Sequence, residues 1–280
     1  MALFEDVLLT VDYDRTLTAP DSTIPERNME AIRYFMAEGG AFTVNTGRSL
    51  PQSAVIRENV PMNTAFLACN GSVCLENGQL SNLHCIELPI EETLRAVCEA
   101  FPELNVDLHG VYAHYGFQPR GCWEEYCTAQ GFPYALAQPG TDYGPFLKFN
   151  VYSPLRATGV GHLYTGTQEE VALIDRAEAW LRETYGDKLT VIRSMPRVLN
   201  VHAPGVSKLR AARDLQKKLG RKILVCVGDE ENDLAMLEGA DYAFSPAGSP
   251  MAQRFCPVCR CEDGAVADVI YEKLPEILRG

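Results

Sequence analysis

The sequence contains no apolar stretch long enough to cross a bilayer, which takes about 20 consecutive predominantly apolar residues. Residues 1–6 include no lysine or arginine, so the basic region that begins a secretory signal peptide is absent as well. We therefore expect a cytoplasmic protein that does not bind a membrane.

Positive charge is also scarce. The chain has 25 lysines and arginines against 37 acidic residues, and its formal net charge is -12 at pH 7. A field of this sign repels nucleic-acid backbones and anionic lipid, so these partners are disfavoured. An anionic small substrate would need a positive group placed at its own site.

The cysteines do not follow a complete zinc-site pattern, although the chain has ten of them. Cys256, Cys259 and Cys261 form one CxxCxC group, but the sequence has no second CxxC or HxxxH motif to supply further ligands. Ordinary reduced thiols are the preferred interpretation, and a metal site at these three cysteines stays the alternative.

Four short apolar runs each end in polar residues. The runs and the residues that follow them are 7–11 with Asp12 and Asp14, 41–44 with Thr46 and Gly47, 65–69 with Asn70, and 222–227 with Asp229, Asn232 and Asp233. Such runs predict parallel strands buried on both faces, and ligand sites in parallel sheets lie beyond the carboxyl ends of the strands. The pattern predicts an α/β fold with a doubly wound, Rossmann-like core and one composite site.

The middle of the chain interrupts this alternation. An amphipathic helix is expected over residues 168–185, with strands around 111–117 and over 146–152, 189–193 and 197–202. Its aromatic residues are expected in its core, with contact of some of them with the substrate as the alternative: Tyr112, Tyr115, Phe117, Trp123 and Tyr126. We therefore predict a catalytic core of residues 1–84 and 202–280, with residues 85–201 inserted as an α+β cap domain.

The polar residues at the strand ends suit the hydrolysis of a phosphate ester. This reaction needs a nucleophile, an acid for the leaving oxygen, a cation and carboxylates that hold a divalent metal. Asp12 and Asp14 supply candidates for the first two, and Asp229 and Asp233 complete an oxygen-rich shell of the kind magnesium prefers. Thr46 with Gly47, and Lys208 at the start of a helix predicted over 208–219, are candidates to hold phosphate oxygens.

These motifs resemble those of the haloacid dehalogenase-like (HAD) phosphatases. The segment from Asp12 to Thr16 is similar to their DxDGT motif, Thr46-Gly47-Arg48 to their second motif, Lys208 to their third, and the segment from Gly228 to Asp233 to their GDxxND motif. The insertion between the second and third motifs resembles the Cof-type subfamily with a type IIB cap.

The resemblance implies a role for each matching residue. Asp12 would be the nucleophile and a magnesium ligand, and Asp14 the general acid/base with its backbone carbonyl on the metal. Thr46, Gly47 and Lys208 would hold the phosphoryl group. Asp229 and Asp233 would complete the metal site, and Asn70 or Asn232 would contact phosphate or substrate. The implied enzyme is a magnesium-dependent phosphatase acting on a small phosphorylated metabolite such as a sugar phosphate, as a monomer or homodimer.

Two positions depart from the family pattern. Arg15 stands where the family has glycine, and Pro246 where an asparagine is usual. We expect Arg15 to contact the substrate beyond the transferred phosphoryl group, and a role-free surface arginine is the alternative. Two other functions stay open: a phosphomutase of the same fold, and a weakly active protein that binds magnesium and phosphate for regulation.

Overall fold

The computed structural model describes residues 2–140, 142–156 and 160–279 of the 280-residue chain. The chain forms two compact units, each described here by itself. The core unit comprises Met1–Gly47, Val55–Asn82 and Ser207–Gly280, and the cap unit comprises Arg48–Ala54 and Leu83–Val206. The segment Arg48–Ala54 thus groups with the cap unit, although it lies outside the insertion predicted over residues 85–201.

Five parallel strands form the sheet of the core unit, in the order β14-β13-β12-β1-β2. Their bounds are β1 Val7–Val11, β2 Ala41–Val44, β12 Ile223–Val227, β13 Tyr242–Pro246 and β14 Cys256–Val258. All residues of β1 and β2 are buried, as continuous apolar runs predict for a sheet covered on both faces.

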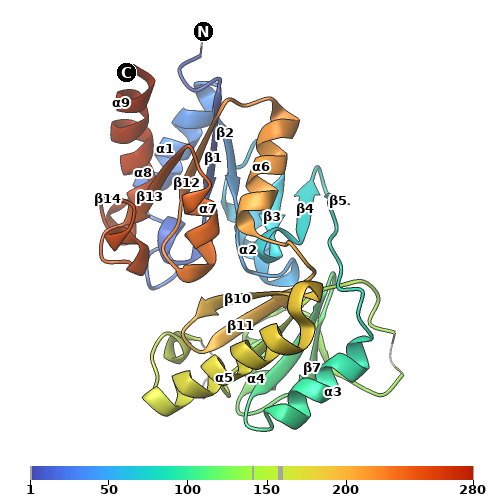
Figure 1. Ribbon diagram of the computed structural model, residues 1–280. Helices are drawn as coiled ribbons and strands as arrows, with labels where there is room; N and C mark the ends of the chain where they lie inside the picture. The colour runs from blue at the N-terminus through green and yellow to red at the C-terminus, as the bar shows by residue number, and fades with distance from the viewer. Residues whose placement is uncertain (1, 141, 157–159, 280) are drawn as a thin grey trace. The chain divides into compact units, whose positions relative to one another are not determined.

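Helices cover both faces of this sheet (Figure 1). Helices α1 (Glu26–Ala37), α8 (Ala265–Asp268) and α9 (Leu274–Arg279) lie on one face, and α6 (Lys208–Leu219) and α7 (Leu234–Glu238) on the other. The short α2 (Ala54–Asn59) also belongs to the core unit, from its second residue onward. In α6, Ala212 and Leu215 pack against Leu8 and Leu224 of the sheet, as the spacing of apolar residues predicts. The predicted doubly wound α/β core is confirmed.

The prediction of a parallel strand over residues 65–69 is wrong, because this run forms an antiparallel strand in a separate sheet. Strands β3 (Phe66–Ala68), β4 (Val73–Glu76) and β5 (Gln79–Ser81) pair antiparallel, and β4 and β5 are joined by the two-residue turn Asn77-Gly78. Both turn residues have positive φ, 49° and 76°, as a tight hairpin requires. A single parallel bridge between Asn45 and Leu67 joins β3 to the chain directly after β2.

The cap unit is built on a six-stranded sheet with the order β10-β11-β9-β6-β7-β8. Its strands are β6 Asn105–Gly110, β7 His114–Gln118, β8 Tyr134–Leu136, β9 Phe146–Tyr152, β10 Thr190–Met195 and β11 Val198–His202. All neighbours pair antiparallel except β7 and β8, which are parallel. The predicted cap, a sheet with helices, is therefore confirmed in its class.

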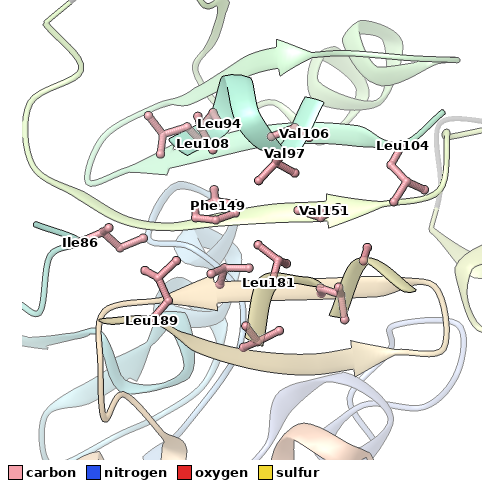
Figure 2. Packing of buried hydrophobic residues seen from close by; sticks show 14 of the residues in the cluster. Ile86, Leu94, Val97, Leu104, Val106, Leu108, Phe149, Val151, Leu181 and Leu189 are labelled. Carbon is pink, nitrogen blue, oxygen red and sulfur yellow. The ribbon is translucent and has the colours of Figure 1, made fainter. Parts of the chain in front are cut away.

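Helices α3 (Ile90–Ala100) and α5 (Gln168–Tyr185) supply one side of the cap core, and α4 (Trp123–Gln130) packs in a second cluster. In the first cluster, Val97 of α3 and Leu181 of α5 lie near Val106, Leu108 and the other apolar residues of the sheet (Figure 2). The residues that alternate with these, such as Asp107, face the opposite side of the sheet because successive side chains of a strand point to opposite faces.

The predicted aromatic core of the cap is correct for four residues and wrong for Tyr112. Trp123 is buried, and Tyr115, Phe117 and Tyr126 pack against the two clusters. Tyr112 is 76% exposed, because the chain turns between β6 and β7 at residues 111–113.

Among the helices of the described residues, none combines the length and apolarity that a membrane span requires.

Candidate active site

Three neighbouring strands of the core sheet end beside the candidate site. Asp12 follows β1, Thr46 follows β2 and Asp229 follows β12, and β1 lies between the other two strands. The backbone N–H of Asp12 donates to the carbonyl of Val227 (2.9 Å), so the pairing of β1 with β12 continues into the site. The carboxyl ends of these strands therefore gather residues that are more than 200 positions apart in the sequence.

Lys208 joins two of the predicted carboxylates. Its Nζ donates to Asp12 Oδ1 (2.5 Å) and to Asp233 Oδ1 (2.7 Å), and all three residues are buried. Lys208 is the first residue of α6, where Ser207 caps the helix and Asn45 Nδ2 donates to the Lys208 carbonyl (2.9 Å). Burial alone would lower the pKa of Lys208, but the two carboxylates raise it above its ordinary value, so the lysine is a cation.

The turn after β12 holds Asp229 and Asp233 close together. Asp233 Oδ2 accepts hydrogen bonds from the backbone N–H groups of Asp229 (3.0 Å) and Glu230 (3.2 Å). A Cβ added at Gly228 would lie 2.5 Å from Asp233 Cγ, so only glycine fits at that position. Asp229 in turn accepts a hydrogen bond from Thr16 Oγ1 (2.9 Å), which ties this turn to the one after β1.

The acidic groups of the site raise one another's pKa. Burial, together with Asp233 and Asp14, raises the pKa of Asp12 to about 7 even though Lys208 opposes the shift. Burial, Asp12 and Asp233 raise the pKa of Asp229 well above its ordinary value. These shifts show that ionising all three carboxylates is costly, because together they would carry more negative charge than Lys208 neutralises.

A magnesium ion would balance the negative charge of the ionised aspartates. Asp12, Asp229 and Asp233 each offer a ligand atom, and these atoms lie within 4.8 Å of one another. Three carboxylates and one ammonium leave two negative charges, which one divalent cation balances, and carboxylate oxygens are the ligands that magnesium prefers. The Asp14 side chain is outside this group. Its predicted metal contact is through the backbone carbonyl and stays a prediction.

Apart from Lys208 and Arg15, the residues predicted to bind phosphate or substrate form a second group. Asn232 Nδ2 lies 3.4 Å from Asn70 Oδ1, and a Cβ added at Gly47 would lie 3.0 Å from that oxygen and 3.5 Å from Asn232 Nδ2. Thr46 is buried, and its carbonyl accepts from the backbone N–H of Asn70 (2.9 Å). The structure thus places Thr46, Gly47, Asn70 and Asn232 together, next in sequence to Asp233.

Asp14 and Arg15 lie in the turn Tyr13–Leu17 that follows Asp12, and both are half-buried. Arg15 has φ 58° and ψ 7°, in the left-handed region where a residue other than glycine is strained by about 1–2 kcal/mol. The glycine that the family pattern places here would adopt this conformation without that cost.

Three contacts of the site were not predicted from the sequence: those of Thr16 with Asp229, of Asn45 with Lys208, and of Glu230 with Asp233. Thr16 lies inside the first motif and Asn45 directly precedes Thr46, so their positions alone were a usable signal.

Pro246 is buried at the end of β13 and pairs with Val258 of β14.

The CxxCxC cysteines do not gather into a metal site. The described residues contain one group of three metal-ligating side chains, the three aspartates above, and all ten cysteines are free thiols. Cys256 is exposed and Cys261 is buried, so their side chains lie in different environments.

Residues 9–245 match the family model of the haloacid dehalogenase-like hydrolases. The chain belongs to this family. A candidate phosphatase from Streptococcus pyogenes serotype M6 is 24% identical over 238 residues, covering 82% of this chain and 83% of the relative. The predicted family is therefore confirmed, and the protein is a HAD-like hydrolase.

Solved structures share the fold of this HAD-like hydrolase over nearly its whole length. A haloacid dehalogenase-like hydrolase from B. subtilis has a TM-score of 0.77 at 18% identity, with 95% of this chain and 99% of that chain covered. A HAD subclass IIB sugar phosphatase has a TM-score of 0.71 at 16% identity, with 95% and 99% covered. At these identities the likeness shows the fold of each unit and no more.

Proposed function

We propose that this HAD-like hydrolase is a magnesium-dependent phosphatase that hydrolyses a small phosphorylated metabolite through an aspartyl-phosphate on Asp12. The observation that carries the proposal is the placement of Asp12: a buried carboxylate at the end of a parallel strand, bonded to Lys208 and beside Asp229 and Asp233. This arrangement supplies a nucleophile, a cation and metal ligands at one point.

The proposed reaction has two steps. A carboxylate oxygen of Asp12 attacks phosphorus, the bond to the leaving oxygen breaks, and Asp14 gives that oxygen its proton. Water then attacks phosphorus of the acyl phosphate and gives a proton to Asp14, the bond between phosphorus and the Asp12 oxygen breaks, and inorganic phosphate leaves with both aspartates restored. When bound, magnesium offsets the negative charges of the nucleophile and the phosphoryl group, which otherwise repel each other.

The other predicted residues hold the phosphoryl group in this proposal. Lys208 keeps Asp12 oriented and faces the incoming charge, while Asp233 keeps Lys208 in place through its 2.7 Å contact. Thr46 and Gly47 offer a hydroxyl and backbone N–H groups, with Asn70 and Asn232 beside them. Hydrogen-bond donors fixed before the substrate arrives stabilise the charge of the transition state most effectively.

The substrate proposed is a sugar phosphate or a similar phosphorylated metabolite. The sugar phosphatase that shares the fold supports this class. In this proposal the cap unit decides which ester is accepted, since it carries none of the carboxylates of the site. We also propose a cytoplasmic protein, a choice supported by its ten free cysteines, acting as a monomer or homodimer.

A phosphate-release screen with a panel of phosphorylated metabolites tests the function. We expect turnover with magnesium, none in excess chelator, and a loss of at least about 100-fold in Asp229→Asn, because the metal site loses a charged ligand. Full activity in chelator would contradict the metal requirement. Conversion of one sugar phosphate isomer into another would favour the phosphomutase, and binding without release across the panel would favour the regulatory alternative.

A further inference from the structure

Arg15 occupies a strained backbone position that its own turn imposes. The N–H of Thr18 donates to the Tyr13 carbonyl (3.0 Å), and the N–H of Arg15 donates to Thr18 Oγ1 (3.2 Å). These bonds, with the bond from Thr16 to Asp229, hold the turn closed around Arg15. The positive φ is therefore set by the neighbours of Arg15, and glycine or asparagine would satisfy it at lower cost.

Backbone strain at a functional site indicates that the side chain of the strained residue has a role there. The charge of Arg15 lowers the pKa of Glu230, whose own pKa is raised to about 7 chiefly by burial and by Asp233. The bond from Thr16 Oγ1 to Asp229 (2.9 Å) places the turn that contains Arg15 beside the carboxylate cluster. Glu230 already takes part in the hydrogen bonds of its own turn with Asp233, so that turn does not depend on Arg15 for its shape.

Arg15 directly follows Asp14, and this position indicates which part of a substrate Arg15 would contact. Asp14 is the residue proposed to protonate the leaving oxygen, and consecutive Cα atoms lie about 3.8 Å apart. Both residues are half-buried, whereas Tyr13, Thr16 and Leu17 of the same turn are buried. Arg15 is therefore the charged residue next in the chain to the proposed acid, and its side chain is not fully buried within the turn.

We propose that Arg15 is a specificity-determining residue that binds a second anionic group, a carboxylate or a second phosphate, on the leaving part of the ester. This inference rests on the proposed phosphatase function and narrows its substrate class to doubly anionic esters. The planar guanidinium matches the two oxygens of a carboxylate or phosphate, which lysine or a backbone N–H does not do as well. On a chain with a net charge of -12, such a substrate requires local positive charge at the site.

The test compares two esters that share a three-carbon skeleton, phosphoglycerate with a carboxylate and glycerol phosphate without one. Each is measured as a competitive inhibitor of nitrophenyl phosphate hydrolysis, so neither has to be a good substrate. We expect the intact protein to bind phosphoglycerate at least about tenfold more tightly, about 1.4 kcal/mol. A hexose bisphosphate and the matching monophosphate form a second pair, which separates a phosphate from a carboxylate as the anionic group.

Arg15→Gly and Arg15→Asn should remove this tenfold preference, and Arg15→Lys should keep part of it. Both neutral variants suit the left-handed backbone, so their thermal midpoints should not fall below that of the intact protein. Ser22→Gly is the matched control, since Ser22 is also a non-glycine residue with positive φ (69°) but is exposed in another turn. It should leave the preference unchanged.

Three results overturn the inference: equal binding of the paired esters by the intact protein, a preference that survives in Arg15→Gly, or equal weakening of both esters together with lost stability. The last would assign Arg15 a structural role. No hydrolysis of nitrophenyl phosphate or any panel ester by the intact protein would instead refute the phosphatase function, and the inference would fall with it.

Discussion

Each unit of this HAD-like hydrolase buries an aspartate in a different way. In the cap unit, Asp107 Oδ2 accepts from Trp123 Nε1 (3.0 Å) and from the Tyr152 hydroxyl (2.9 Å), and Oδ1 lies 3.1 Å from His109 Nε2. In the core unit, Asp12 is bonded to Lys208 but lies among other carboxylates. The two side chains are similarly buried, with residue exposures of 5% and 6%.

The pKa shifts of the two aspartates have opposite signs. Burial alone would raise the pKa of Asp107, but His109 and the hydrogen bond from Trp123 bring it below its ordinary value. For Asp12, burial and the neighbouring carboxylates outweigh Lys208 and raise the pKa to about 7. Asp107 is a satisfied structural anion, whereas the raised pKa of Asp12 means that a nearby metal cation would favour its ionised form.

Replacing each aspartate in turn should give the largest difference between an effect on kcat and an effect on the free energy of unfolding. Asp12→Asn should lower kcat by at least about 10⁴-fold, because the neutral amide does not attack phosphorus, while the protein still unfolds cooperatively. The measurement is phosphate release at saturating substrate, with urea unfolding as the check on the fold. Appreciable turnover by Asp12→Asn would show that another residue is the nucleophile.

Asp107→Asn should show the reverse pattern. The variant loses a charged acceptor that Trp123 and Tyr152 share, so the free energy of unfolding should fall by about 3 kcal/mol. Urea unfolding measures the loss, and Asp187→Asn, at an exposed site of the same unit, serves as the control with less than about 0.5 kcal/mol. Equal stabilities for the two variants would mean that Asp107 is no more important than a surface charge.

Magnesium should raise the free energy of unfolding by binding at the core site, and it should not act through the buried aspartate of the cap unit. At a concentration about 100 times its Kd, the ion should add about 2.7 kcal/mol to the free energy of unfolding. Asp229→Asn should lose most of that gain, and Asp107→Asn should keep it, because only the first removes a candidate ligand. Urea unfolding with and without the ion checks both, and a gain that survives in Asp229→Asn would place the binding elsewhere.

The response to pH should also differ between the aspartates in the metal-free protein. A carboxyl with a raised pKa binds its proton more tightly in the folded state, so its contribution to stability falls as pH rises from about 4 to about 7. Asp12→Asn should make this fall shallower by at most about 1.4 kcal/mol per pH unit, while Asp229, whose pKa is also raised, still contributes to it. The Asp107 contribution is full above the ordinary Asp pKa and is lost only in stronger acid.

Unfolding at a series of pH values in chelator, for the intact protein and for Asp12→Asn, measures the difference. Identical pH profiles would show that Asp12 titrates normally in the folded protein.

The parts of the fold that follow a simple periodicity were predictable from the sequence. The helices Gln168–Tyr185 and Lys208–Leu219 and the strand Phe146–Tyr152 lie where they were expected, because each has a regular apolar pattern and clear end signals. The carboxylates of the core site were predictable for a related reason: each follows a buried strand, and parallel strands end at one edge of the sheet.

The cap was less predictable because its sheet buries polar side chains. Strand β6 carries Asp107 and His109 among its buried residues, so it does not read as an apolar run, and the expected strand was placed over the turn that exposes Tyr112. The grouping of Arg48–Ala54 with the cap unit depends on contacts distant in sequence, such as the 2.6 Å hydrogen bond between Ser49 and His114. No local pattern carries that information.

In the proposed mechanism Asp12 carries the phosphoryl group between the two steps. Quenching the enzyme during turnover, reducing it with borohydride and mapping the peptides tests this, because reduction of an aspartyl-phosphate leaves homoserine at that position. We expect homoserine at Asp12, dependent on both magnesium and substrate. Modification at Asp14, Asp229 or any other residue, or an unmodified Asp12 during steady turnover, would contradict it.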